Sequence, residues 1–246
     1  MIRIAIALGL MMATMTASNA SELKLIAGGS LAGLFKELGP QFEKASGHTL
    51  SIHFDSTPNI VSRINAGTPF DAVVVPADVF KDAAAKSKLA APTVNVARVG
   101  YGVIVRAGAA KPDLSTSEAF KKALLAASSV SSVPSSAAGA YIAKVYERLG
   151  IAEQMKTKTR VEAAPTAIAP AVARGEAELG IFLTNVFNAP GIELAGPFPA
   201  DLQQELIFPA AVAIDAKELT AAKALVDFLK TPGAISAIKA AGMTPG

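Results

Sequence analysis

The stretch Leu25-Ile26-Ala27-Gly28-Gly29-Ser30-Leu31-Ala32-Gly33-Leu34-Phe35 joins a short apolar run, two glycines, a serine and an apolar pattern of helical spacing. It predicts a buried strand that leads directly into a helix. The first N–H groups of a helix have no partner within it, and the helix dipole places partial positive charge at that end. A helix start above a strand end therefore suits an anion, and Ser30 adds a hydroxyl to it.

Strand-like and helix-like segments alternate along the rest of the chain. The strands are predicted at 23–27, 50–54, 72–75, 101–105, 130–133, 160–162, 179–183 and 208–214. The helices are predicted at 31–44, 58–65, 79–86, 118–127, 138–149, 166–174, 216–230 and 232–241. This alternation is typical of largely parallel sheets with helices on both faces, so the predicted fold class is α/β.

The alternation restarts near residues 96–100 and returns near 207–209, which predicts two lobes joined by two chain crossings. Lobe 1 would contain residues 21–97 and 209–246, and lobe 2 residues 98–208. Each lobe would hold a mostly parallel sheet flanked by helices. Ligands of open α/β sheets bind at the carboxyl ends of the strands, so two facing lobes would enclose a binding cleft.

Residues 1–20 have the pattern of a secretory signal peptide, with Arg3, an apolar run at 4–12 and the small-residue site Ser18-Asn19-Ala20. We expect cleavage after Ala20 and a periplasmic location in a two-membrane bacterium. The apolar run is shorter than the roughly 20 residues of a membrane span, and no later segment is suitable, so the mature chain is expected to have no membrane span. The sequence has no cysteine, so we expect no disulfide in the exported protein.

Composition narrows the class of partner. A hydrophobic content of 51% against 17% charged residues indicates a globular chain with a substantial core. No dense run of Lys and Arg points to nucleic acid. Neither a Ser/His/Asp set, a Walker loop nor a dinucleotide fingerprint is present, and His48 and His53 lack the spacing of metal ligands. A small anionic ligand is the partner class that the helix start at Ser30 favours.

Several phrases agree in order and spacing with one known family. They are AGGSL at 27–31, FEKASGH at 42–48, RINAGTPFDAV at 63–73, AGAY at 138–141 with RLG at 148–150, and GEAELGI at 175–181. Over essentially the whole mature chain they resemble the periplasmic solute-binding proteins of molybdate-type ABC transporters. The resemblance implies a two-lobed clamshell that closes on an anion, with no metal or cofactor of its own. It also implies an inner-membrane ABC permease as partner, and we expect the mature protein to be a monomer.

In the molybdate binders, the oxyanion is held by two serines at helix starts, two backbone N–H groups and a tyrosine hydroxyl. The resemblance places the first serine at Ser30, the second at Thr57 and the first backbone donor at Ala138. Ser56 and Ser136 stand beside these positions and are predicted ligand contacts as well. The structural alternative for Ser30, Ser56 and Thr57 is the capping of a helix, and for Ser136 and Ala138 it is a plain connecting loop of small residues.

The other two donors are missing. The second backbone donor falls on Pro165, which has no N–H, and the tyrosine falls on Leu183. A shift of one residue would place Thr166 and Thr184 there instead. Charge-assisted hydrogen bonds contribute about 1.5–3 kcal/mol each, so the loss of two would weaken binding by roughly two to four decades. We therefore expect a different anion from molybdate, such as a small carboxylate.

Two other functions stay open. Some proteins similar to this family are periplasmic isomerases of a tricarboxylate such as aconitate, and moving the double bond requires a base beside a carboxylate. The sequence identifies no such base, so the catalytic residues of an isomerase would be unknown and binding without catalysis is favoured. A protein that presents its ligand to a sensor would have the same sequence features as a transport protein.

Overall fold

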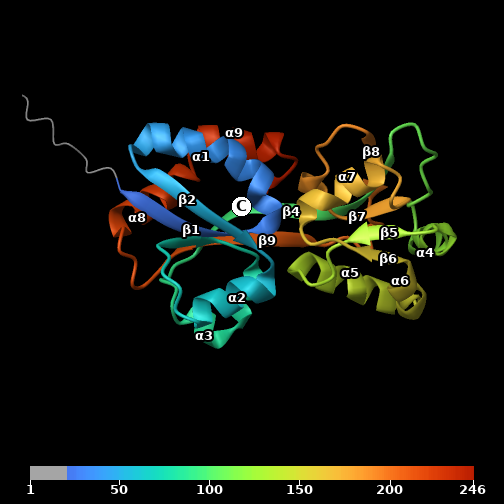
Figure 1. Ribbon diagram of the computed structural model, residues 1–246, viewed down its shortest axis with the longest axis horizontal. Coiled ribbons are helices and arrows are strands. Elements are labelled where there is room, and N and C mark those ends of the chain that lie inside the picture. The colour runs from blue at the N-terminus through green and yellow to red at the C-terminus, as the bar shows by residue number, and fades with distance from the viewer. Residues whose placement is uncertain (1–20) are drawn as a thin grey trace, which may run out of the picture.

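Two long strands connect the two halves of the molecule: β4 (Val94–Arg106) and β9 (Glu205–Val212). Figure 1 shows helix-covered groups of elements on either side, with these two strands running between them. The computed structural model describes residues 21–246, and the predicted signal peptide at 1–20 lies outside the described residues. No helix of the described part is both long and apolar enough to cross a membrane.

The first half is built on three parallel strands, in which β1 pairs with β2 on one side and β3 on the other. Helices α1 and α9 cover one face of this sheet, and α2 and α3 cover the other (Figure 1). Its elements are β1 (Glu22–Gly28), η1 (Gly29–Leu31), α1 (Ala32–Ser46), β2 (Thr49–Asp55), α2 (Thr57–Asn65), β3 (Ala72–Val74), η2 (Ala77–Lys81), α3 (Ala83–Lys86), α8 (Leu219–Phe228), α9 (Pro232–Ala240) and β10 (Thr244–Pro245).

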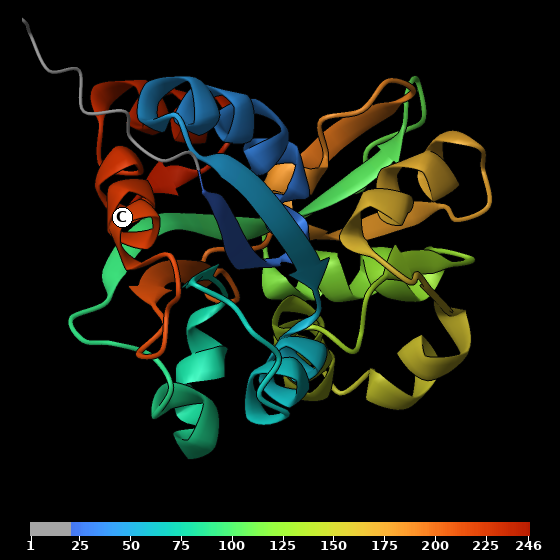
Figure 2. The same cartoon turned by 60° about the vertical axis from the view of Figure 1, so that its left-hand side comes forward.

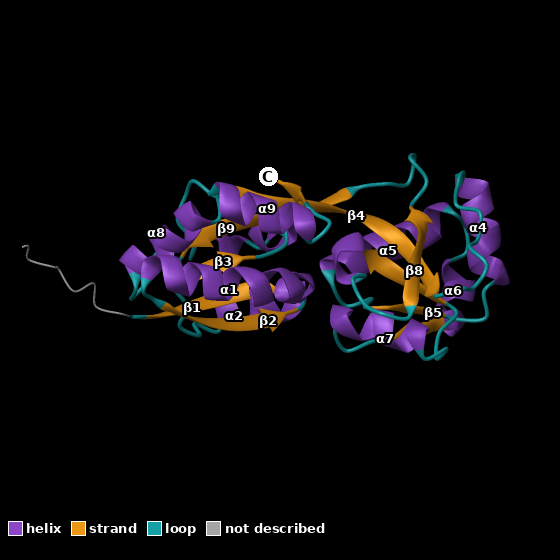
Figure 3. Ribbon diagram, turned by 90° about the horizontal axis from the view of Figure 1, so that it is seen from above, coloured by secondary structure: helices purple, strands orange, loops and turns teal. Residues whose placement is uncertain are grey.

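The second half repeats this plan with three parallel strands, β6, β5 and β7. Seen from above in Figure 3, its helices are separate from those of the first half. Its elements are α4 (Ser117–Ala126), β5 (Val130–Ser132), α5 (Ala137–Arg148), α6 (Ala152–Lys158), β6 (Thr159–Val161), η3 (Pro165–Ala167), α7 (Ile168–Ala173), β7 (Leu179–Leu183), η4 (Thr184–Val186) and β8 (Ile192–Pro197).

A continuous path of strands, β2-β1-β3-β9-β4-β7-β5-β6, joins the two halves. Strand β4 changes partners between Gly100, which is paired with Glu205 of β9, and Tyr101, which is paired with Leu183 of β7. At this point the side-chain amide of Gln203 accepts a hydrogen bond from Tyr101 N–H and donates one to Tyr101 C=O, both at 2.9 Å. The predicted division at residues 97/98 and 208/209 stays a prediction.

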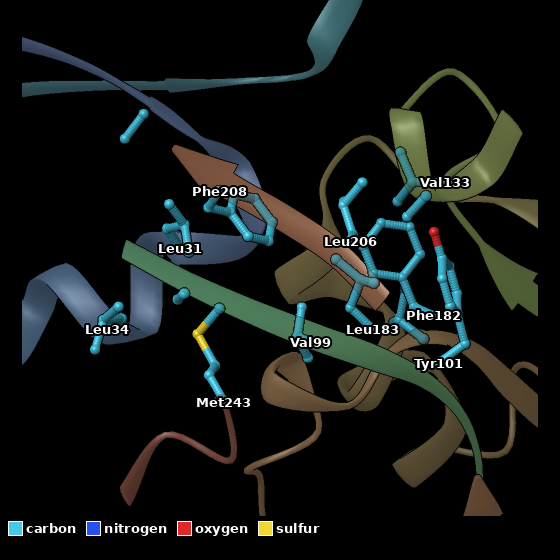
Figure 4. Close-up of a cluster of buried hydrophobic side chains, with 14 of the residues drawn as sticks. Leu31, Leu34, Val99, Tyr101, Val133, Phe182, Leu183, Leu206, Phe208 and Met243 are labelled. Carbon is cyan, nitrogen blue, oxygen red and sulfur yellow. The ribbon is translucent and has the colours of Figure 1, made fainter. Parts of the chain in front are cut away.

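The hydrophobic core follows the two shared strands from one half into the other. Figure 4 shows Leu31 beside Phe208, then Val99, and further along Leu183 and Phe182, within one buried cluster. Hydrophobic side chains on neighbouring strands and helices pack in this way because each removes the other's apolar surface from water. The core therefore stabilises the region between the halves as well as each half itself.

The predicted α/β fold, with two lobes and two crossings, is confirmed, although several element boundaries differ. The predicted helix at 79–86 is two short pieces, because Asp82 is extended at ψ 116° and caps α3 by accepting from Ala85 N–H at 2.8 Å. Strand β4 begins before the predicted residue 101. Helix α6 and strand β8 were not predicted, and β8 pairs only with β4 across a register shift between Val103 and Ile104.

Candidate ligand-binding site

A cavity of about 170 Å³ lies where the two halves face each other. From the first half it is lined by the ends of β1 and β2 and the starts of η1 and α2, and from the second by the starts of α5 and η3 and the end of β7. Figure 2 shows β2 directed with its carboxyl end toward the second half. The cavity is smaller than the roughly 300–1,000 Å³ of drug-sized pockets, which fits a small ligand.

On the first side, three predicted residues present polar groups to this cavity: Ser30, Ser56 and Thr57. Ser30 is only 8% exposed, and its hydroxyl has no hydrogen-bond partner within residues 21–246. Ser56 is the N-cap of α2, yet its side chain accepts no capping bond. The Thr57 hydroxyl is buried and also lacks a partner in that part of the chain. A buried hydroxyl without a partner is costly, so a ligand that pairs with the Thr57 hydroxyl would be favoured.

On the second side of the cavity, the serine at the helix start already has hydrogen-bond partners within the protein. Ser136 is the N-cap of α5, and its hydroxyl accepts from Gly139 N–H at 3.0 Å and donates to Val133 C=O at 2.8 Å. That hydroxyl is thus used within the fold. The first intrahelical bond of α5 runs from Ala140 N–H to Ser136 C=O, so the N–H groups of Ala137 and Ala138 precede it and are available at the helix start.

The remaining predicted residues of this side lie around η3 and η4. Pro165 and Leu183 line the cavity, so the positions that lack a donor do face it. Thr166 also lines the cavity and is exposed, at the start of η3. Thr184, by contrast, is not among the lining residues; its methyl group lies against Gly102 of β4 instead.

The charged group in the cavity wall is a carboxylate. Asp55 lies at the end of β2 and accepts from Ser56 N–H at 2.7 Å and from Asn59 Nδ2 at 2.7 Å, and His53 Nε2 lies 3.2 Å from it. Burial raises its pKa, but the hydrogen bonds from Asn59, Ser56 and His53 outweigh burial and lower the pKa below its usual value. Asp55 is therefore ionised, and its oxygens are already paired.

The rest of the wall is apolar, and no Lys or Arg of the described chain contributes to it. Figure 4 shows Val133, Phe182, Leu183 and Leu206, all of which line the cavity, gathered on one side. An anion in this cavity would be held by hydroxyl and N–H dipoles at helix starts, and its apolar part would contact this wall.

Six of the seven predicted contacts thus line one cavity; Thr184 does not. Whether any of them binds a ligand stays a prediction. Sequence reasoning placed Asp55 at a strand end near the cleft but did not predict it as a ligand contact, and it gave no role to His53, which pairs with Asp55. The apolar wall gave no signal, because Val133, Phe182 and Leu206 resemble any other core residue in the sequence.

Known proteins with similar sequences match nearly the whole chain. The chain is 30% identical to the molybdate-binding protein ModA of Azotobacter vinelandii over 92% of this chain and 91% of that protein. It is 29% identical to the aconitate isomerase of a Pseudomonas species over 94% of this chain and 90% of that protein.

Solved structures show the same fold. The periplasmic molybdate-binding protein of Azotobacter vinelandii superposes with a TM-score of 0.75 at 20% identity, covering 91% of this chain and 99% of that one. The tungstate-binding protein TupA of Desulfovibrio alaskensis superposes with a TM-score of 0.63 at 15% identity, covering 92% and 99%.

The sequence profile of the family described as "Bacterial extracellular solute-binding protein" matches residues 23–244. This match spans both halves and the crossings between them. Together with the molybdate-binding relatives and the two-lobed fold, it shows that this chain belongs to the bacterial extracellular solute-binding proteins, among those of the molybdate type.

Proposed function

We propose that this protein captures a small anion, an oxyanion or a small carboxylate, between its two lobes and delivers it to an inner-membrane ABC permease. The observation that carries the proposal is the convergence of the starts of η1, α2 and α5 on one cavity. Helix starts attract negative charge through their free N–H groups and dipoles. The proposal includes export to the periplasm with removal of residues 1–20, and a monomeric mature protein.

Within this proposal, lobe 1 (21–97 and 209–246) contributes the hydroxyls of Ser30, Ser56 and Thr57. Lobe 2 (98–208) contributes the backbone at the start of α5, where Ser136 is the cap and Ala138 offers its N–H, and Thr166 at η3. Because each lobe supplies only part of the donor set, the ligand binds the closed state more tightly than the open one and shifts the population toward it. We keep Thr184 as a contact only if the lobes shift on binding.

The ligand is expected to differ from molybdate. Pro165 and Leu183 face the cavity at positions where the molybdate binders are expected to have donors, and the ionised Asp55 adds a negative charge to the wall. The apolar wall supports an organic anion with a carboxylate at one end. These features favour a small carboxylate over a compact tetrahedral oxyanion.

The test is a thermal-shift screen of the mature protein against molybdate, tungstate, sulfate, phosphate, citrate, the aconitates and other small carboxylates. A ligand at a hundredfold excess over Kd stabilises the folded state by about 2.7 kcal/mol. Such a stabilisation by a carboxylate would support the proposal. The same stabilisation by molybdate would contradict the change of specificity, and none from any of these anions would contradict anion binding.

The relative at 29% identity that is an aconitate isomerase supports one alternative, isomerisation of a tricarboxylate. Among the described residues that line the cavity, Asp55 alone has an ionisable side chain, so it is the candidate base. Its lowered pKa and paired oxygens make it a weak base, which favours binding without catalysis. Chromatography of cis-aconitate incubated with the protein decides this: formation of trans-aconitate that is lost in Asp55→Asn would establish the isomerase.

A further inference from the structure

A hydrogen bond crosses between the two sides of the cavity at Ser30. The side-chain amide of Asn185 donates from Nδ2 to the Ser30 carbonyl oxygen at 2.7 Å. Asn185 lies in η4, directly after β7 in the second half, whereas Ser30 lies in η1, directly after β1 in the first half. The two residues are 155 positions apart in the chain, so this hydrogen bond directly joins the two halves of the molecule.

The oxygen of the Asn185 side-chain amide indicates which way the amide group is oriented. Asn185 Oδ1 is buried and has no hydrogen-bond partner within residues 21–246. The side chain is thus held by what its Nδ2 contacts. Reversing the amide would place an acceptor against the Ser30 carbonyl, so the donor must face Ser30.

The segments around this bond lie within ordinary van der Waals distance of one another. A Cβ atom added at Gly29 would lie 3.5 Å from the Cδ of Pro165, which places η3 of the second half directly against η1 of the first. Segments η1, η3 and η4 therefore meet next to the cavity. Separating the lobes would break the Asn185–Ser30 bond and this packing together.

We propose that Asn185 is a positioning residue that holds the Ser30 turn in the closed arrangement and so maintains a closed population in the ligand-free protein. A hydrogen bond of this kind has a modest net strength, because both groups are hydrated when the lobes separate. Its loss should lower the closed-to-open ratio about 2- to 12-fold. If the closed state is the one that binds, the apparent affinity falls as the closed fraction falls.

Only the affinity part of this inference depends on the proposed function; the closure part does not. The chain has no cysteine, so two introduced cysteines can be labelled specifically. We choose the exposed positions Lys36→Cys on α1 and Lys144→Cys on α5, one in each half. Pulsed electron spin resonance on the ligand-free, doubly spin-labelled protein then reports the closed and open populations as two distances.

In this background, Asn185→Ala should lower the closed-to-open ratio about 2- to 12-fold. Asn185→Asp should lower it as well, because a carboxylate cannot donate to a carbonyl. The matched control is Asn188→Ala, an exposed asparagine in the following loop, which should leave the populations unchanged. Circular dichroism and the melting temperature establish that each variant is folded.

Two results would overturn the proposal: a parent protein with no closed population, or an Asn185→Ala variant with the parent's distances. A general loss of stability would lower the melting temperature without moving the distances of the folded protein. For the affinity part, citrate and molybdate serve as probes in titrations of the same variants. If neither probe binds the parent, the proposed ligand class fails while the label distances still decide the role of Asn185.

Discussion

The two sides of the cavity use the same sequence signal, a serine at a helix start, in opposite ways. On the first side, the hydroxyl of Ser30 has no partner in the described chain, and the side chain of Ser56 makes no capping bond. On the second side, the Ser136 hydroxyl is paired twice, with Gly139 N–H and Val133 C=O. At these serine positions the first side therefore offers side-chain donors, whereas the start of α5 on the second side offers backbone donors.

The two helix starts also differ in how tightly they are packed. On the second side, α5 starts so close to the preceding loop that Gly139 has no room for a side chain, and Ser136 is drawn back onto Val133. On the first side, a Cβ atom on Gly29 would meet only ordinary van der Waals contacts, and no hydrogen bond within residues 21–246 engages the Ser30 hydroxyl. A helix start thus becomes a side-chain site only where the packing leaves its hydroxyl free.

The first prediction compares the loss of stability when alanine replaces a glycine at each of the two helix starts. The loss at Gly139 is the largest effect that we expect. A Cβ on Gly139 would lie 2.5 Å from Pro134 Cα, a backbone atom that cannot move aside. We expect Gly139→Ala to lower the free energy of unfolding by about 3 kcal/mol or more. In Gly29→Ala the new atom would meet contacts at 3.5 Å, so the loss should be about 1 kcal/mol or less.

Chemical denaturation of both variants measures this contrast. Equal losses for Gly139→Ala and Gly29→Ala would show that the second side is not the more tightly packed one. The m-value should stay unchanged, because neither substitution alters the surface that unfolding exposes.

The second prediction restores a donor to the second side. Leu183 is 1% exposed and faces the cavity. Leu183→Tyr should raise the affinity for molybdate about 10- to 100-fold, because one charge-assisted hydrogen bond contributes about 1.5–3 kcal/mol. Leu183→Phe is the matched control, since it adds the ring without the hydroxyl. Calorimetric titration with molybdate measures both affinities. Equal affinities of Leu183→Tyr and Leu183→Phe would contradict the prediction.

The third prediction separates capping from binding. Ser136→Ala removes the cap of α5 and should lower the free energy of unfolding by about 1 kcal/mol. Ser30→Ala removes an unpaired hydroxyl, so stability should change by less than about 0.5 kcal/mol while affinity for the ligand of the screen falls. Urea denaturation of both variants gives the free energy of unfolding, and ligand titration gives the affinity. A larger stability loss for Ser30→Ala than for Ser136→Ala would reverse the assigned roles.

The smallest effect concerns pH. The pKa of Asp55 in the folded protein lies below its ordinary value of 3.8. A lowered folded pKa stabilises the protein above the unfolded pKa, and this contribution is lost as the pH falls below about 4 toward the folded value. The stability difference between the parent and Asp55→Asn should therefore shrink between pH 5 and pH 3. Urea denaturation at several pH values checks this, and a constant difference would argue against the lowered pKa.

Much of the fold could be predicted because local patterns carry it. The apolar run at 23–27 and the helical spacing at 31–44 appear in the structure as β1 and α1 with small shifts at their ends. Strand β8 was missed because its residues Ile192–Pro197 include a glycine and a proline, and its pairing depends on β4 far away in the sequence. Element type is local information, whereas pairing of this kind is not.

Part of the candidate site could also be predicted from the sequence. The helix start after a strand end identified Ser30, and the resemblance added Thr57 with its neighbour Ser56; chain order places such turns at one edge of a parallel sheet. The same reasoning could not separate Thr166, which lines the cavity, from Thr184, which packs on Gly102. Which side of a short turn faces the cavity depends on how the two lobes approach each other.

The sequence by itself determined the alternation of strands and helices, the two lobes and the anion-suited turn at Gly28-Gly29-Ser30, since these follow from residue spacing and local backbone chemistry. Only the tertiary structure decided that Ser136 is consumed as a cap, that Asp55 stands in the cavity wall, and that Asn185 reaches Ser30 across 155 positions. The physical reason is that a hydrogen bond depends on distance and direction in space, and packing between the lobes sets both.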